Sequence, residues 1–368
     1  MNVLAQEEKE QHLFLSGYIK NLHEFSFVDQ LDQLQWTTFL HNRLNFKYTP
    51  TDNLTLRLEL RSRLFYGDNV KNFPGYSEFI GQDNGIADLS WNIVDSHSVL
   101  FNSTMDRAYV NYTKGDWDIT IGRQRINWGM NLLWNPNDIF NTYNFLDFDY
   151  EERPGSDAVR VQYYLGDFDK IEIAAKKGRR KDDIVAAMYK FNKWSYDVQL
   201  ITGIYRQDWI IGAGWAGNLK NAGFKGEVTY FVPYETYVNA ENVLSASVSV
   251  DYGFKKGLYI HGSMLYNTIT SETSSGLTTL AYADLSAKNL MPFEFSGMLQ
   301  LAKEFTPIFR GTVTTIYSPT NDSVIIVPSL DYSIATDWEL NLTGQSFFEF
   351  EDHNTLGNSL FVRIRWSF

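Results

Sequence analysis

Hydrophobic and polar residues alternate along most of the chain from about residue 11 onward. A clear example lies between residues 54 and 66, where the alternating residues are Leu54, Leu56, Leu58, Leu60 and Leu64 on one parity and Thr55, Arg57, Glu59, Arg61 and Arg63 on the other. A β-strand places alternate side chains on opposite faces, whereas a helix would scatter these leucines around its circumference. The pattern therefore predicts a strand with one apolar face and one strongly cationic face.

The same alternation predicts about eighteen strands, with sixteen as the alternative count. They lie near residues 12–24, 35–48, 53–67, 99–114, 117–128, 157–166, 169–177, 183–193, 195–206, 208–217, 223–233, 242–254, 258–268, 293–303, 309–318, 323–335, 338–350 and 359–368. Every second connection is short and would lie at one end of a barrel. The long connections all fall between these and would lie at the other end; they are 68–98, 129–156, 234–241 and 269–292. This asymmetry is typical of bacterial outer-membrane barrels. We expect an all-β fold, with residues 6–368 forming one antiparallel transmembrane β-barrel that carries long ordered outer or inward-folded loops.

The chain ends in an alternating strand with an aromatic last residue. Leu360, Val362, Ile364, Trp366 and Phe368 share one face, and Arg363, Arg365 and Ser367 share the other. This segment resembles the closing strand of bacterial outer-membrane β-barrels, in which the terminal Phe is an assembly signal. The resemblance implies a Gram-negative outer membrane, insertion by the barrel-assembly machinery through Phe368, and contact with outer-membrane lipid and lipopolysaccharide.

Composition narrows the possible functions. Aromatic residues make up 16% of the 368 residues, as expected where aromatic girdles mark two membrane interfaces. Cysteine is absent, which excludes disulfides and cysteine-ligated metals, and the net charge of −12 argues against nucleic acid as a partner. Residues 1–5 fit either the end of a secretory signal, with cleavage before Gln6, or an ordinary start of the chain.

The most distinctive motif follows the strand expected at 117–128. It reads Gly122-Arg123-Gln124, then Trp128-Gly129, then Asn135-Pro136-x-Asp138. Over roughly residues 117–160 it resembles a broad group of porin-like outer-membrane proteins, including alginate-export-like and related substrate-channel barrels, in which this segment folds inward as a loop. The resemblance implies barrel lineage and indicates no substrate.

A basic wall is expected on the lumen face, opposite the apolar parity. Its members are Arg43, Lys47, Arg57, Arg61, Arg63, Arg107, Arg160, Arg363 and Arg365. Either these side chains line a pore, or they pair with lumen carboxylates such as Glu59 and serve only to hold the barrel together. A milder opposite wall is expected from Ser245, Ser247, Ser249, Asp251, Glu339, Asn341, Thr343 and Gln345.

The segment 129–156 carries too much apolar surface for a disordered loop. Its acids Asp147, Asp149, Glu151 and Glu152 are candidates for a constriction that faces the basic wall. Arg123 and Arg125 fall on the parity expected to face lipid, so we expect a bulge or an inward turn near Gly122, or a strand that has already left the membrane. The loop 68–98 is either packed against the first loop or an outer shield.

Catalytic chemistry has no support in the sequence. There is no Gly-x-Ser-x-Gly elbow, no His-Glu-x-x-His helix, and none of the six His residues has a metal-ligand spacing partner. We therefore expect no enzyme activity, no metal and no cofactor. The sequence predicts a porin-like channel for passive diffusion of small hydrophilic solutes. The alternative is a non-conducting barrel that acts as an accessory subunit of a larger outer-membrane complex; a homo-oligomer is also possible.

Overall fold

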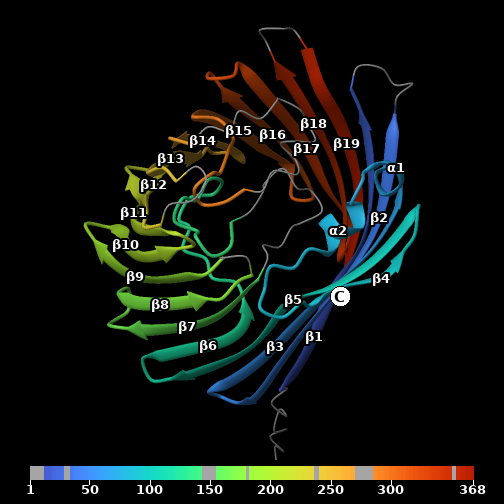
Figure 1. The fold of residues 1–368 in the computed structure, drawn as a ribbon. Helices are drawn as coiled ribbons and strands as arrows, with labels where there is room; N and C mark the ends of the chain where they lie inside the picture. Colours follow the sequence, from blue (N-terminus) through green and yellow to red (C-terminus); the bar gives the residue numbers. More distant parts are fainter. Residues whose placement is uncertain are drawn as a thin grey trace, which may run out of the picture.

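The computed structural model describes residues 12–28, 34–142, 155–179, 182–235, 240–269, 285–349 and 354–368. In this part of the chain nineteen strands form one closed sheet, with two short helices beside it (Figure 1). The elements are β1 (Leu13–Phe27), β2 (Gln35–Thr51), β3 (Leu54–Gly67), α1 (Asp68–Asn72), α2 (Tyr76–Gly81), β4 (Ser90–Asp95), β5 (Val99–Lys114), β6 (Trp117–Gln124), β7 (Ser156–Tyr164), β8 (Lys170–Lys176), β9 (Ile184–Lys193), β10 (Tyr196–Tyr205), β11 (Asp208–Leu219), β12 (Ala222–Pro233), β13 (Val243–Gly253), β14 (Leu258–Asn267), β15 (Phe295–Thr306), β16 (Phe309–Ser318), β17 (Ser323–Ala335), β18 (Trp338–Glu349) and β19 (Asn354–Ser367).

The sheet closes where the first strand meets the last. β1 and β19 pair antiparallel, with Tyr18 opposite Ser367, and two backbone hydrogen bonds of 2.9 and 3.0 Å join Gly17 and Phe368. Because β3 pairs directly with β5, the wall of the barrel contains eighteen strands and β4 stands outside that count. The predicted all-β antiparallel barrel is confirmed, and eighteen is the right strand count.

β4 has no counterpart among the expected strands, and β6 ends at Gln124, not at residue 128. The two departures are linked. β6 pairs only with residues 108–114 of β5, and β4 pairs with residues 100–104, so β4 satisfies backbone groups of β5 beyond the point where β6 leaves the wall. An unpaired strand edge is costly, which explains why a short strand covers it.

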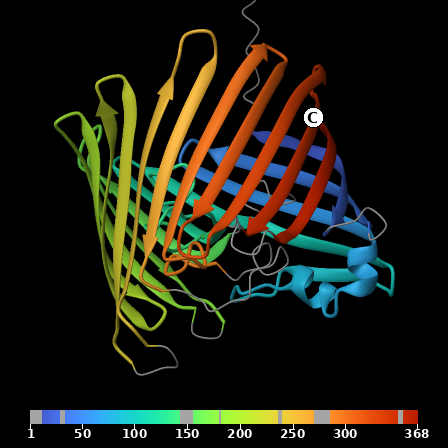
Figure 2. The ribbon, with the colours of Figure 1, turned by 90° about the horizontal axis from the view of Figure 1, so that it is seen from above.

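The two ends of the barrel differ, as the connection lengths predicted. Figure 2 shows tight hairpin turns at one end of the barrel and both helices at the other. The short turns include Gly115–Asp116 and the pair at Trp194–Ser195, where both residues have positive φ. In the described residues, no helix is long and apolar enough to cross a membrane.

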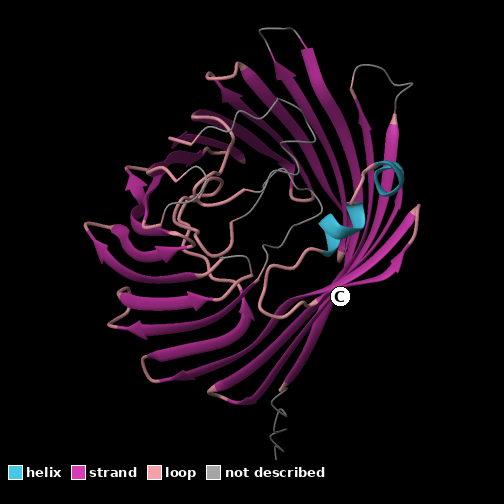
Figure 3. Ribbon diagram, in the orientation of Figure 1, coloured by secondary structure: helices cyan, strands magenta, loops and turns pink. Residues whose placement is uncertain are grey.

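Side chains alternate between the two faces of the wall. Leu58 is 46% exposed on the outside, whereas its neighbours Glu59 and Arg61 are buried inside. The inner face also carries an apolar patch from five strands, which packs against Tyr76, Val70, Phe73 and Ile80; the patch comprises Leu22, Phe39, Phe65, Leu100 and Phe361. The segment with α1 and α2 therefore folds onto the inner wall and is more than an outer shield (Figure 3).

Candidate functional site

A buried ion network occupies part of the basic wall. Arg43 contacts Glu59 and Asp106, each at 2.5 Å, and Arg61 lies 3.1 Å from the same Asp106. Arg43 and Arg61 stand directly opposite each other on β2 and β3, and like charges in that position repel. Asp106 contacts both guanidinium groups and relieves this repulsion; whether the arginines line a pore or only hold the barrel stays a prediction.

Asp106 reaches the network because of a β-bulge. On β3 the consecutive residues Glu59 and Leu60 pair with Arg107 and Met105, so Asp106 has no partner across the ladder. An extra residue in one strand shifts the alternation, and Asp106 and Arg107 are both buried on the inner side. Reading parity from the sequence therefore missed Asp106.

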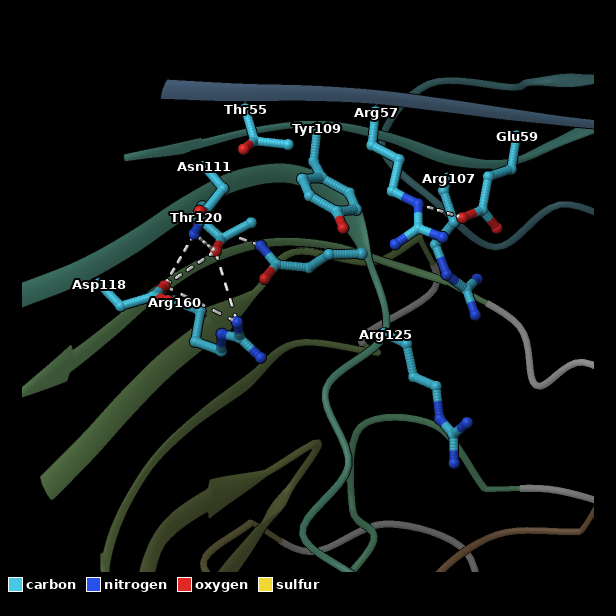
Figure 4. Close-up of a pocket in the computed structure, with 11 residues that line it drawn as sticks. Thr55, Arg57, Glu59, Arg107, Tyr109, Asn111, Asp118, Thr120, Arg125 and Arg160 are labelled. Atoms are coloured by element: carbon cyan, nitrogen blue, oxygen red, sulfur yellow. Dashed lines mark hydrogen bonds and ion pairs between the residues drawn. The ribbon is translucent and has the colours of Figure 1, made fainter. Parts of the chain in front are cut away.

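A second part of the wall borders open space. A cavity of about 450 Å³ lies on the inner side of the wall, beside the first half of β3, the second half of β5, β6 and the middle of β7 (Figure 4). Four guanidinium groups and two carboxylates line it, together with hydroxyl, amide and phenol groups; the residues are Thr55, Arg57, Glu59, Arg107, Tyr109, Asn111, Asp118, Thr120, Gln124, Arg125 and Arg160.

The cationic groups of this cavity are only partly neutralised by its acids. Arg57 lies 2.6 Å from Glu59 but keeps 42% of its side chain exposed. Arg160 is 21% exposed and lies 3.9 Å from Asp118, a separation that allows only a weak ion pair. Two of the four guanidinium groups, those of Arg57 and Arg160, therefore keep part of their surface exposed and can donate hydrogen bonds to an anion.

The other expected wall residues lie outside this cavity. The ammonium of Lys47 stands 5.7 Å from the Phe14 ring, and the guanidinium of Arg365 stands 4.4 Å from the Tyr18 ring. Arg63 stacks on Phe65 at 5.0 Å, and Arg363 faces Asn341 across the β18–β19 ladder. The four acids expected to form a constriction, Asp147, Asp149, Glu151 and Glu152, lie outside the described residues.

The motif residues build the inward turn. Gly122 has φ 119°, a conformation that favours glycine, and the chain enters the barrel after Gln124. Gln124 donates to the carbonyl oxygens of Thr120 and Ala158, each at 3.0 Å, and Trp128 donates to Glu172 at 2.8 Å. Residues 125–142, which we call the inward segment, then run inside the ring (Figure 3).

Arg123 is buried, although its parity had suggested lipid exposure. Its guanidinium contacts Asp83 at 2.6 Å and Asp157 at 2.7 Å, and it also donates to the carbonyl oxygen of Ala87 at 2.9 Å. Gly85 lies so close that a β-carbon there would stand 2.1 Å from the guanidinium. Arg123 therefore clamps the loop after α2 to the end of β6 and the start of β7, a role that its place in the motif had not indicated.

The milder wall expected opposite the arginines is in part covered. Ser247 and Ser249 each lie 2.6 Å from the Asn131 side chain, and Ser247 also donates to the carbonyl oxygen of Trp134. These serines therefore bind the inward segment.

The remaining motif residues Asn135, Pro136 and Asp138 belong to that segment; Asn135 and Asp138 are buried. Within the described residues, no group of three or more His, Cys, Asp or Glu is arranged to hold a metal ion.

Comparisons with known proteins show which fold this is. The solved structure of OccAB4 from Acinetobacter baumannii matches with a TM-score of 0.61 and 10% identity, over 99% of this chain and 100% of that chain. OccK11 (OpdR) from Pseudomonas aeruginosa gives 0.59 and 9%, over 97% and 96%. OpdK from the same organism, solved with vanillate, gives 0.58 and 10%, over 96% and 98%.

The chain has the fold of the Occ porins. At about 10% identity this likeness establishes architecture and nothing finer. No protein-family model matches the sequence, and no curated protein matches it either. The resemblance of residues 117–160 to the alginate-export-like group stays a prediction.

Proposed function

We propose that this protein is a porin-like channel in the outer membrane of a Gram-negative bacterium, through which small hydrophilic solutes diffuse passively, with a preference for anions. Two observations support the proposal. The fold is that of Occ porins, one of which, OpdK of Pseudomonas aeruginosa, is described as an outer membrane protein. The second observation, the cavity with four arginines in the lumen, carries the preference for anions.

Fixed charge in a narrow aqueous path raises the local concentration of ions of opposite sign. The arginines of the cavity should act in this way because Arg57 and Arg160 remain partly exposed. OpdK has been solved with vanillate, an aromatic carboxylate, so an organic anion of that size is a reasonable probe for this channel too. We expect passive diffusion without catalysis.

The test is a planar-bilayer recording across a KCl gradient. The wild-type protein should give stable current steps and a zero-current potential on the anion-selective side. Replacing Arg57 and Arg160 by Gln should shift that potential towards cations, whereas the exposed Lys114→Gln variant serves as the control and should leave it unchanged. A folded barrel that carries no current would favour the accessory-subunit alternative.

A further inference from the structure

The inward segment is held by a row of residues that run straight across the wall. Gln199 on β10, Gly214 on β11, Glu227 on β12 and Ser247 on β13 are cross-strand neighbours in register. Each of them touches the inward segment. Such a row is a built docking surface, because four adjacent strands contribute to it at hydrogen-bonded positions in register.

Glu227 stands at the centre of this row and makes the densest set of contacts. One carboxylate oxygen accepts from the backbone N–H groups of Met130 and Asn131, the latter at 2.7 Å, and the other accepts from the N–H of Asn137 at 2.9 Å. Glu227 is only 1% exposed. A single side chain therefore satisfies three backbone donors from two separate stretches of the segment.

The neighbours of Glu227 complete the fit. Gln199 donates to the carbonyl oxygen of Trp128 at 2.7 Å, and Asn137 approaches so closely that a β-carbon at Gly214 would stand 2.8 Å from its amide nitrogen. The side chain of Thr229 donates to Asn137 at 2.6 Å. The wall is thus shaped to receive the backbone of the segment, with glycine where space is needed.

We propose that Glu227 is a positioning residue that holds the inward segment flat against the wall and so keeps the lumen clear. The inference rests on the proposed channel function only for its effect on current. Without the carboxylate, three buried N–H groups lose their acceptor, and burying an unpaired donor is unfavourable. The segment should then leave the wall part of the time and obstruct the lumen.

Thiol labelling tests the docking without reference to conduction, because the natural chain has no cysteine. Asn131 is 8% exposed and Leu132, its neighbour, is 53% exposed, so Asn131→Cys reports docking and Leu132→Cys is the matched control. Asn131→Cys itself removes the bonds to Ser247 and Ser249, so the reference is the Asn131→Cys protein that keeps Glu227. Relative to that reference, maleimide labelling at position 131 in a Glu227→Ala background should be faster by about tenfold or more, a factor that corresponds to 1.4 kcal/mol. Labelling at position 132 should stay the same.

Single-channel recording tests the consequence. Glu227→Ala should show frequent partial closures that the wild type lacks. Joining Asn131→Cys to Ser247→Cys with a short bifunctional thiol reagent should abolish these closures in the same Glu227→Ala protein. Rescue by tethering is an outcome that general destabilisation of the barrel would not give.

Several results would overturn the proposal. One is unchanged labelling at position 131 in the Glu227→Ala background. Another is a Glu227→Ala channel whose current shows no partial closures. If that variant does not fold, Glu227→Gln, which keeps the volume and one acceptor oxygen, should give intermediate labelling; failure of both variants to form a barrel would assign Glu227 to folding instead. If the wild type carries no current, the channel function fails, while the labelling result still decides whether Glu227 docks the segment.

Discussion

The ion network around Asp106 gives a prediction whose size follows from the structure. Asp106→Asn keeps the volume of the side chain but removes the charge that lies between Arg43 and Arg61. All three side chains are at most 8% exposed, and removing one partner of a buried ion pair costs about 3–5 kcal/mol. Because Arg43 keeps its contact with Glu59, we expect the free energy of unfolding to fall by an amount at the lower end of this range, about 3 kcal/mol.

Asp118→Asn is the matched control, since it is the same chemical change on the same inner face. Asp118 is 19% exposed and lies 3.9 Å from Arg160, so its loss should cost less than about 1 kcal/mol. The assay is urea unfolding of each variant in lipid vesicles, followed by the gel shift between folded and heated protein. Equal unfolding free energies for the two variants would refute the reasoning.

Three further predictions concern the wall and its seam. Leu58 is 46% exposed on the outer face, and if it lies near the bilayer midplane, Leu58→Arg should lower the free energy of unfolding by about 2–4 kcal/mol in the same vesicle assay. A smaller decrease would indicate that Leu58 lies nearer the membrane interface. Phe368→Ser should lower the yield of inserted barrel while Phe368→Tyr should retain it, because an aromatic ring covers Gly17 at the seam; equal yields would argue against the terminal signal. Arg123→Ala should make the loop around Asp83 more sensitive to protease than Arg123→Lys does, since the clamp is lost; equal cleavage rates would contradict that role.

Sequence alternation predicted the wall because a barrel strand must present apolar side chains to lipid at every second position. Where this constraint is absent, the prediction failed. β4 covers the edge left by β6, and its six residues, Ser90–Asp95, carry too short a pattern to stand out. The bulge at Asp106 has no signature in the alternation either.

The inner face was harder to predict, because its residues pack against folded loops instead of facing lipid or water. Ile184, Ala186 and Met188 alternate as a lipid-facing row would, yet they are buried in one cluster with Ile126 and Trp128 of the inward segment. The outer face of the same strand is also apolar, as Val185 at 51% exposure shows. A strand that is apolar on both faces was the available signal that something docks inside.

The central claim is that the lumen is open and that its arginines favour the passage of anions. Its most direct test is the uptake of two solutes of equal size, vanillate and its neutral amide, into vesicles that contain the protein. Vanillate should enter faster in 0.1 M salt, where charges act over about 10 Å, and its advantage should shrink in 1 M salt, where the range falls to about 3 Å. Equal uptake of the two solutes in low salt, or faster uptake of the amide, would contradict the account.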